Sequence, residues 1–293
     1  MNPIQRIEAK ATDLGEGMIV YRALPTKQCR MIGAWCFLDH AGPMPFAPGQ
    51  GMHVGAHPHT SLQTFSWLIE GEVLHRDSLG SKQVIRPGEV NLMTAGHGIV
   101  HTEDTLPEAT GMHLAQLWIA LPSSAKDCAP AFDHYPVLPR WVADHCTFTL
   151  LAGTYAGHTA PATLYTPLIG MDVLASAATT LTLPLDPAFE YGLFALEGGF
   201  TCGAEAFNTN ELAYLGAGSA AVTVELTAGT RLLLLGGEPF AEQITMWWNF
   251  VGHSKEDIMK AQQQWAAKDP RFGVVDNPDE RRLVAPPLPW AGS

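Results

Sequence analysis

The sequence predicts an all-β protein of the sandwich or barrel type, organised as two domains. Short apolar or alternating runs recur along the chain, and Gly, Pro and Asp separate them, as is typical of strands joined by tight turns. Long amphipathic segments between these runs, which a parallel α/β architecture needs, are missing. The chain has 293 residues, and at about 100–200 residues per domain this length favours two domains over one large all-β domain.

The expected strands follow these runs in chain order. Each run is rich in β-branched, aromatic and aliphatic residues and is short enough for a single strand. The clearest examples cover residues 31–38, 62–69, 113–121, 147–152, 193–196 and 230–235.

Only one helix is predicted, and it begins after Ser254. This serine is a suitable N-cap, and Glu256 and Asp257 fall in the first turn, where the helix dipole favours negative charge. Pro270 marks the end of the helix. An apolar stripe at helical spacing predicts a face packed against a barrel, and it consists of Ile258, Ala261 and Trp265.

A faint internal repeat divides the chain. Residues 68–72 resemble residues 195–199, because in each case an apolar strand runs into a Glu-Gly turn. This similarity fits two copies of one β-unit. The Pro-rich stretch 122–139 between them is interpreted as a linker or crossover, and the tail 276–293 as an extended surface segment.

The charge balance is acidic, with 17 Lys and Arg against 29 Asp and Glu and a formal net charge of −12. Such a surface repels phosphate backbones, so direct binding of nucleic acid is not expected. The N-terminus lacks the apolar core of a signal peptide, and no stretch of about 18 apolar residues is present to span a membrane. The five cysteines form no Cys-x-x-Cys pair and are interpreted as free thiols in a reducing compartment. We therefore expect a cytoplasmic protein.

Two pairs of potential metal ligands stand about forty residues apart. His57 and His59 are separated by one residue, and so are His101 and Glu103. Side chains at positions i and i+2 of a strand point to the same face, with Cα atoms roughly 6.5 Å apart. Inward-facing positions of neighbouring barrel strands meet near the axis. The spacing therefore predicts that three imidazoles and one carboxylate converge on one divalent ion.

The residue types narrow the chemistry of this site. A single His-x-His pair in a strand is more often hydrogen-bonded to carbonyl groups or water than bound to metal, but two such pairs beside Gly-rich turns favour a shared ion. Imidazole suits Fe, Cu, Ni and Zn, and a carboxylate adds negative charge. The absence of thiolate disfavours a structural zinc site of the cysteine type and favours an ion with open coordination positions.

The same segment resembles the pirin branch of the cupin superfamily. The similarity is strong over residues 20–122 and thinner in the second half. The matching motifs are His57-Pro58-His59, Glu70-Gly71-Glu72, His75-Arg76-Asp77-Ser78-Leu79-Gly80, Pro87-Gly88, 93–96, 101–103, and the flanking segments 37–43, 116–122 and 248–252.

The resemblance implies a bicupin, that is, two tandem cupin β-barrels with a short C-terminal helix. It places a metal-binding cupin domain in residues 1–135 and a metal-free cupin domain with the C-terminal helix in residues 136–293. The implied metal ligands are His57, His59, His101 and Glu103, most often on Fe(2+), with Ni, Cu, Mn, Co and Zn as other divalent ions. Glu103 is also the implied catalytic residue.

Several other residues are less clearly assigned. Pirins typically carry Arg where this chain has His97, which is either a donor to the metal ligands or a turn residue facing solvent. His53 and His75 either line the mouth of the cavity or form hydrogen bonds elsewhere. Gln116 and Trp118 share a strand face that looks either toward the site or toward the C-terminal helix. In the second half Leu181, Leu183 and Leu185 replace a His-x-His pair, near Phe189 and Tyr191.

Two functions follow from the resemblance. The first is a quercetin 2,3-dioxygenase-type oxidoreductase, in which the metal activates a flavonol or similar phenol or enol for attack by dioxygen and carbon monoxide is released. The second is an iron-dependent redox-sensing regulator that binds a transcription factor or metabolic enzyme, for which the acidic surface favours a basic protein partner. A sugar-phosphate isomerase or seed-storage cupin fits less well, because basic residues beside the histidine pairs are missing.

Overall fold

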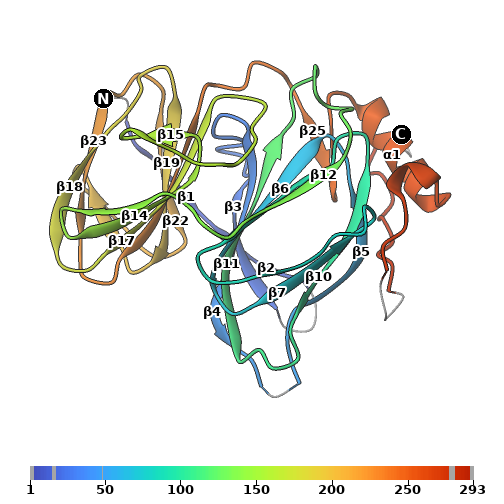
Figure 1. The fold of residues 1–293 in the computed structure, drawn as a ribbon. Helices are drawn as coiled ribbons and strands as arrows, with labels where there is room; N and C mark the ends of the chain where they lie inside the picture. Colours follow the sequence, from blue (N-terminus) through green and yellow to red (C-terminus); the bar gives the residue numbers. More distant parts are fainter. Residues whose placement is uncertain (1–2, 15–17, 48, 277–280, 291–293) are drawn as a thin grey trace. The chain divides into compact units, whose positions relative to one another are not determined.

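The computed structural model describes residues 3–14, 18–47, 49–276 and 281–290, and these residues form mostly β-strands. The predicted all-β class is confirmed (Figure 1). Among the described residues, no helix combines the length and the apolar character that crossing a membrane requires.

Backbone contacts divide the chain into two compact units, each assembled from separate segments. Unit 1 comprises residues 1–42, 115–117 and 137–240, and unit 2 comprises residues 43–114, 118–136 and 241–293. The predicted boundary between residues 135 and 136 stays a prediction.

Two antiparallel sheets and a short hairpin lie wholly within unit 1. The larger sheet has the order β1 (Gln5–Glu8), β22 (Glu211–Gly216), β19 (Glu190–Glu197), β24 (Arg231–Gly237), β17 (Leu168–Ala175), β14 (Cys146–Ala152) and β13 (Arg140–Ala143). The smaller sheet has the order β18 (Thr179–Pro184), β23 (Ala221–Leu226), β20 (Phe200–Cys202) and β21 (Glu205–Phe207). The hairpin pairs β15 (Thr154–Tyr155) with β16 (His158–Thr159).

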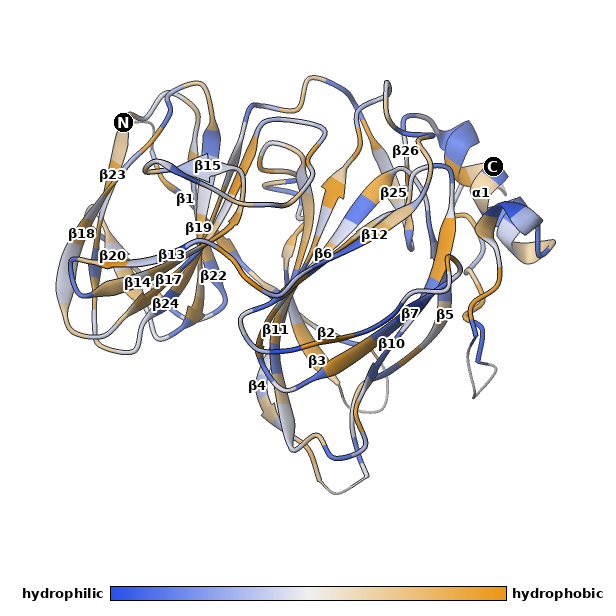
Figure 2. Ribbon diagram, in the orientation of Figure 1, coloured by the Kyte–Doolittle hydropathy of each residue, from blue (hydrophilic) through white to orange (hydrophobic). Residues whose placement is uncertain are grey.

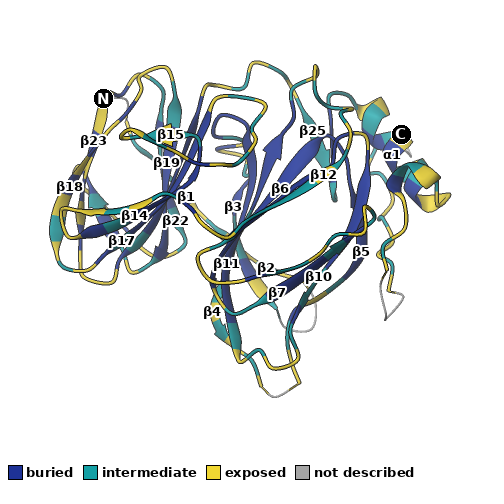
Figure 3. Cartoon of the chain, viewed as in Figure 1, coloured by how far each residue is buried: buried dark blue, intermediate teal, exposed yellow. Residues whose placement is uncertain are grey.

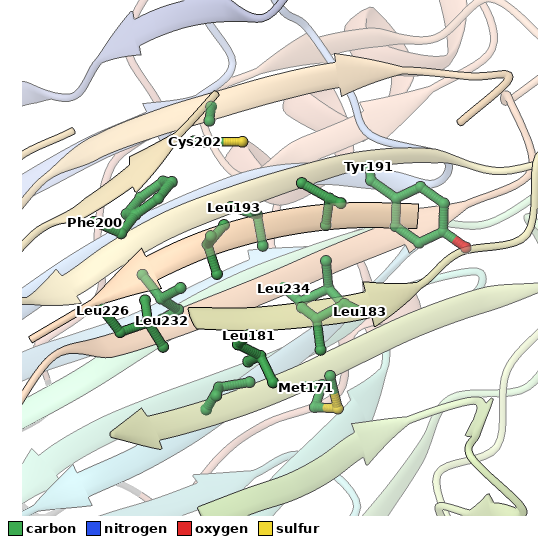
Figure 4. Packing of buried hydrophobic residues seen from close by; sticks show 14 of the residues in the cluster. Met171, Leu181, Leu183, Tyr191, Leu193, Phe200, Cys202, Leu226, Leu232 and Leu234 are labelled. Atoms are coloured by element: carbon green, nitrogen blue, oxygen red, sulfur yellow. The ribbon is translucent and has the colours of Figure 1, made fainter. Parts of the chain in front are cut away.

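Unit 1 contains a large buried apolar cluster. Along β18 buried and exposed residues alternate, so that Leu181 and Leu183 point inward and the intervening positions face solvent. They join a buried cluster with Tyr191, Leu193 and Leu234 (Figure 4). The leucines that replace a His-x-His pair therefore serve as core residues.

A four-stranded sheet of unit 2 carries the histidine pairs. Its order is β5 (His53–His59), β10 (Ile99–Thr105), β7 (Val73–Asp77) and β8 (Lys82–Ile85). A further seven-stranded sheet has the order β12 (Ala131–Tyr135), β9 (Val90–Thr94), β6 (Leu62–Glu70), β11 (Gly111–Ala120), β4 (Trp35–Pro45), β3 (Ile19–Leu24) and β2 (Lys10–Asp13). β5 and β6 are buried over most of their length (Figure 3).

The predicted helix is present as α1 (Lys255–Ala266), after a hairpin of β25 (Thr245–Trp247) and β26 (Phe250–Gly252). The Ser254 hydroxyl accepts a hydrogen bond from the backbone N–H of Asp257 at 3.1 Å, which confirms the N-cap. Hydrophilic and hydrophobic residues are interspersed along α1 (Figure 2), and the buried ones are the expected Ile258, Ala261 and Trp265. A 3-10 helix over Pro270–Phe272 follows.

The internal repeat of residues 68–72 and 195–199 is confirmed at its two Glu-Gly turns. β6 ends at Glu70 and β19 ends at Glu197, and the glycine after each strand has a positive φ, +86° at Gly71 and +66° at Gly198. This left-handed conformation favours glycine at both positions.

One expectation about the connecting segments needs correction, and another gains a detail. The stretch 122–139 is not only a linker, because β12 lies within it and pairs with β9. The described tail residues 281–290 are exposed or half-buried, as expected of a surface segment, and they also pair with β5. The N–H of Ala56 in β5 donates to the carbonyl of Arg281 at 2.7 Å, and the N–H of Leu283 donates to the carbonyl of Ala56 at 2.8 Å. Residues 277–280 and 291–293 of the tail lie outside the described residues.

Candidate metal centre

Three histidines meet where β5 pairs with β10. His57 and His59 lie at the end of β5, two positions apart, and therefore share a face. His101 of β10 is the direct cross-strand partner of His57. One strand thus supplies two imidazoles and its neighbour supplies the third, as the spacing predicts.

The three rings are close enough to share one ion. All are buried, and one nitrogen of each lies within 4.8 Å of the corresponding nitrogens of the other two. The Nε2 atoms of His59 and His101 are 3.1 Å apart. The ring centroids of His57 and His101 are 4.2 Å apart.

Backbone carbonyls orient two of the imidazoles. Nδ1 of His57 lies 2.9 Å from the carbonyl oxygen of Gly55, and Nδ1 of His59 lies 2.9 Å from the carbonyl oxygen of Asn249. A carbonyl oxygen only accepts, so each Nδ1 carries the proton and donates it. The lone pair of each ring is therefore on Nε2 and available to a metal.

Burial keeps these rings neutral. It lowers the pKa of His57 to about 4, although the hydrogen bond to Gly55 acts in the opposite direction. Burial and the neighbouring histidines hold the pKa of both His59 and His101 well below the ordinary value. All three imidazoles are thus in the form that metal binding requires at neutral pH.

Glu103 belongs to a different possible ligand group from that of the three histidines. Its carboxylate forms a second possible ligand group with His75 and His101, again with atoms within 4.8 Å of one another. His75 is the cross-strand partner of Glu103 on β7, whereas the pairing of β10 with β5 shifts register between His101 and Glu103. Burial raises the pKa of the Glu103 carboxyl. Glu103 as a fourth ligand of the same ion stays a prediction.

His75 is the residue whose place at the site the sequence did not establish. It is buried, its Nε2 lies 3.0 Å from Oδ2 of Asp77, and its Nδ1 lies 3.4 Å from Nδ1 of His101. Its ring stacks on Phe132 of β12, with centroids 4.3 Å apart. The motif that begins at His75 was the available signal, but the strand pairing that brings His75 to His101 could not be read from it.

The structure also places three other candidates, His97, His53 and Trp118. His97 is exposed on the turn between β9 and β10, so its alternative role as a donor to the ligands is wrong. His53 is also exposed, and its Nδ1 lies 3.2 Å from Asp104. Trp118 packs edge-to-face on His59, with centroids 5.1 Å apart, so this position of β11 faces the histidine cluster.

Comparison with known proteins assigns the family. The family model for Pirin matches residues 17–119, and the model for the Pirin C-terminal cupin domain matches residues 170–273. The chain belongs to the pirin family. The predicted bicupin architecture is confirmed with it.

Relatives of this pirin cover nearly its whole length. A Pseudomonas aeruginosa protein named "Putative quercetin 2,3-dioxygenase" is 60% identical over 287 residues, 98% of this chain and 91% of the relative. A Caulobacter vibrioides pirin-like protein is 36% identical, covering 92% of this chain and 95% of its own. A crystal structure of a quercetin 2,3-dioxygenase from Acinetobacter baumannii superimposes with a TM-score of 0.96 at 48% identity, covering 98% of this pirin and 96% of that chain.

The imidazole group of this pirin fits a divalent ion. Two nitrogens that bind one ion at about 2.1 Å and at right angles lie roughly 3.0 Å apart. The 3.1 Å between Nε2 of His59 and Nε2 of His101 is close to that separation. A cation between two neutral nitrogens at this distance removes the repulsion between their lone pairs. The buried, neutral imidazoles are therefore suitable ligands for a divalent ion.

The depressed pKa of His57 predicts that the metal-free pirin loses stability in mild acid. Because its folded pKa is about 4 against an ordinary 6.5, the unfolded chain binds more protons between these values. The contribution is complete above about pH 6.5 and is lost as the pH falls toward 4. From His57 alone, we expect the free energy of unfolding to fall by about 2 kcal/mol between pH 7 and 5. Urea titrations at both pH values measure it, and His57→Gln should show a smaller fall. An equal fall in both proteins would contradict the prediction.

Proposed function

We propose that this pirin is a metal-dependent dioxygenase that opens the ring of a flavonol such as quercetin, with His57, His59 and His101 holding the ion. The observation that carries the proposal is the convergence of three buried, neutral imidazoles, two of which have their Nδ1 protons engaged by carbonyl groups. Such a set leaves coordination positions open for a substrate oxygen. The 60% identical relative and the 48% identical structure carry the names of this activity.

Glu103 is the fourth ligand and the proton acceptor in this proposal. It follows His101 by two positions on β10 and is half-buried. Because burial raises its pKa, the carboxylate is a better base toward a phenol or enol hydroxyl than an exposed glutamate. The aromatic ring of Trp118 packs edge-to-face with the buried His59 ring.

Iron(II) is the ion that we propose. Imidazole and carboxylate ligands without thiolate suit it, and the same set accepts Ni, Cu, Mn, Co or Zn. When bound, such an ion supplies a Lewis acid that lowers the pKa of an enol or phenol oxygen and orients it.

The experiment is oxygen uptake with quercetin by protein loaded with each divalent ion in turn. We expect oxygen consumption and carbon monoxide release in equal amounts with the iron-loaded protein, and neither with metal-free protein. Absence of turnover with every ion, in protein that elemental analysis shows to be loaded, would contradict the proposal.

A further inference from the structure

We propose that Asp77 and His75 form a relay that fixes His101 in the tautomer with a free Nε2, so that both are positioning residues for the metal ligand. The inference rests on the proposed metal site, and it concerns residues outside the predicted ligand set. Its chemistry follows from the direction of two hydrogen bonds.

The first hydrogen bond is set by the Asp77 carboxylate. Its Oδ1 accepts from the backbone N–H of Leu79 at 2.9 Å and of Ser81 at 3.0 Å. Oδ2 is thereby turned toward Nε2 of His75, at 3.0 Å. An ionised carboxylate only accepts hydrogen bonds, so Nε2 of His75 carries the proton and Nδ1 of His75 carries the lone pair.

The second hydrogen bond determines which ring nitrogen of His101 carries the proton. Nδ1 of His75 faces Nδ1 of His101 at 3.4 Å. Two lone pairs in contact repel, and His75 already holds its proton on Nε2, so this contact is a hydrogen bond only when Nδ1 of His101 carries the proton and donates it. In that state the Nε2 lone pairs of His59 and His101 face each other at 3.1 Å, and a cation between them removes their repulsion. Nε2 of His101, which faces His59, is left as the lone pair that binds a cation.

Burial and stacking make the relay rigid. Asp77, His75 and His101 are each at most 3% exposed, so water does not compete for these hydrogen bonds. Phe132 stacks on the His75 ring at an interplanar angle of 14° and holds its orientation. The relay holds the proton of His101 on Nδ1, as backbone carbonyls hold the protons of His57 and His59 on Nδ1.

The alternative to the relay is a second ion bound between His75 and His101. His75, His101 and Glu103 themselves form a possible ligand group. Such an ion would replace the proton between the two Nδ1 atoms, and the relay would not exist. The number of ions bound per chain distinguishes the two arrangements, since the relay allows one and the second site requires two.

Asp77→Asn is the sharpest test. The amide oxygen can keep the contacts to Leu79 and Ser81, which places the amide NH₂ against Nε2 of His75 and reverses both hydrogen bonds. The proton of His101 then moves to Nε2, the atom that should bind metal. In metal-free protein at neutral pH, the contact with Nε2 of His59 draws the His101 proton toward Nε2, and the relay opposes it by holding the proton on Nδ1. The ¹⁵N shifts of the His101 ring should therefore report mainly a proton on Nδ1 in the wild type and a proton on Nε2 in Asp77→Asn. Metal affinity should fall about 10- to 100-fold.

Two further variants complete the design. His75→Phe keeps an aromatic ring against Phe132 but removes the acceptor, so it should lose a similar factor in affinity without a fixed His101 tautomer. Glu89→Gln makes the same acid-to-amide change beside His134, whose Nε2 is 3.4 Å from Glu89 and whose Nδ1 pairs with Asn91, and it should leave the His101 tautomer and the affinity unchanged.

A wild-type His101 protonated on Nε2 would overturn the relay, as would an unchanged tautomer in Asp77→Asn or a stoichiometry of two ions. The wild-type tautomer can be read even if Asp77→Asn does not fold. Because the spectra are taken without metal, they test the relay independently of whether the wild-type protein consumes oxygen with quercetin.

Discussion

Replacing His101 with alanine should severely weaken metal binding and, with it, oxygen uptake in the presence of quercetin. Among the described residues, His101 belongs to both possible ligand groups, and its Nε2 is 3.1 Å from that of His59. Loss of a direct ligand should exceed the 10- to 100-fold cost of losing an outer partner, so we expect a fall in metal affinity of more than about 100-fold. Titration with iron(II) or nickel(II) and elemental analysis measure it.

His53→Ala is the matched control for this variant. His53 begins the strand that carries His57 and His59, but it is exposed and pairs with Asp104. It should bind metal as the wild type does. Retention of full metal affinity by His101→Ala would place the ion elsewhere and would contradict the proposed site.

Replacing Leu193 with alanine should produce a large loss of stability. Leu193 lies on β19, is fully buried and belongs to the apolar cluster of unit 1 that Figure 4 shows. Truncation removes buried methyl groups and leaves a cavity that the surrounding strands fill only in part. The expected cost is about 2–5 kcal/mol in the free energy of unfolding, measured by urea denaturation.

Val142→Ala controls for the loss of methyl groups as such. Val142 belongs to the same unit, on β13, and is 73% exposed. Its truncation should change the free energy of unfolding by no more than about 0.5 kcal/mol. If both variants lost the same amount, burial would not be the cause of the effect at Leu193.

The sequence predicted the elements that rest on local signals. The α1 helix follows from Ser254 and from the spacing of Ile258, Ala261 and Trp265, because capping and amphipathicity are both properties of a short segment. The pairing of His57 with His101 follows almost as directly, since two i, i+2 pairs on adjacent strands can meet on one face.

What the sequence left open depends on pairing between distant strands. The register shift between His101 and Glu103 aligns Glu103 with Val54 on one side and with His75 on the other, and no local pattern encodes that alignment. The place of β12 was missed for a similar reason, because Pro130 and Pro136 flank a strand that β9 stabilises. His75 joined the site only through these pairings.

The three imidazoles differ in whether a point mutation can change the hydrogen bond at Nδ1. The carbonyl groups of Gly55 and Asn249 belong to the main chain, so exchanging the side chain at position 249 cannot delete the contact to His59 unless the backbone itself moves. Of the three Nδ1 atoms, that of His101 has a side chain, His75, as its partner. A point mutation at position 75 can therefore change the basicity of Nε2 in His101 and leave that of His57 and His59 unchanged. His101 is thus the ligand through which mutation can change which metal this site prefers.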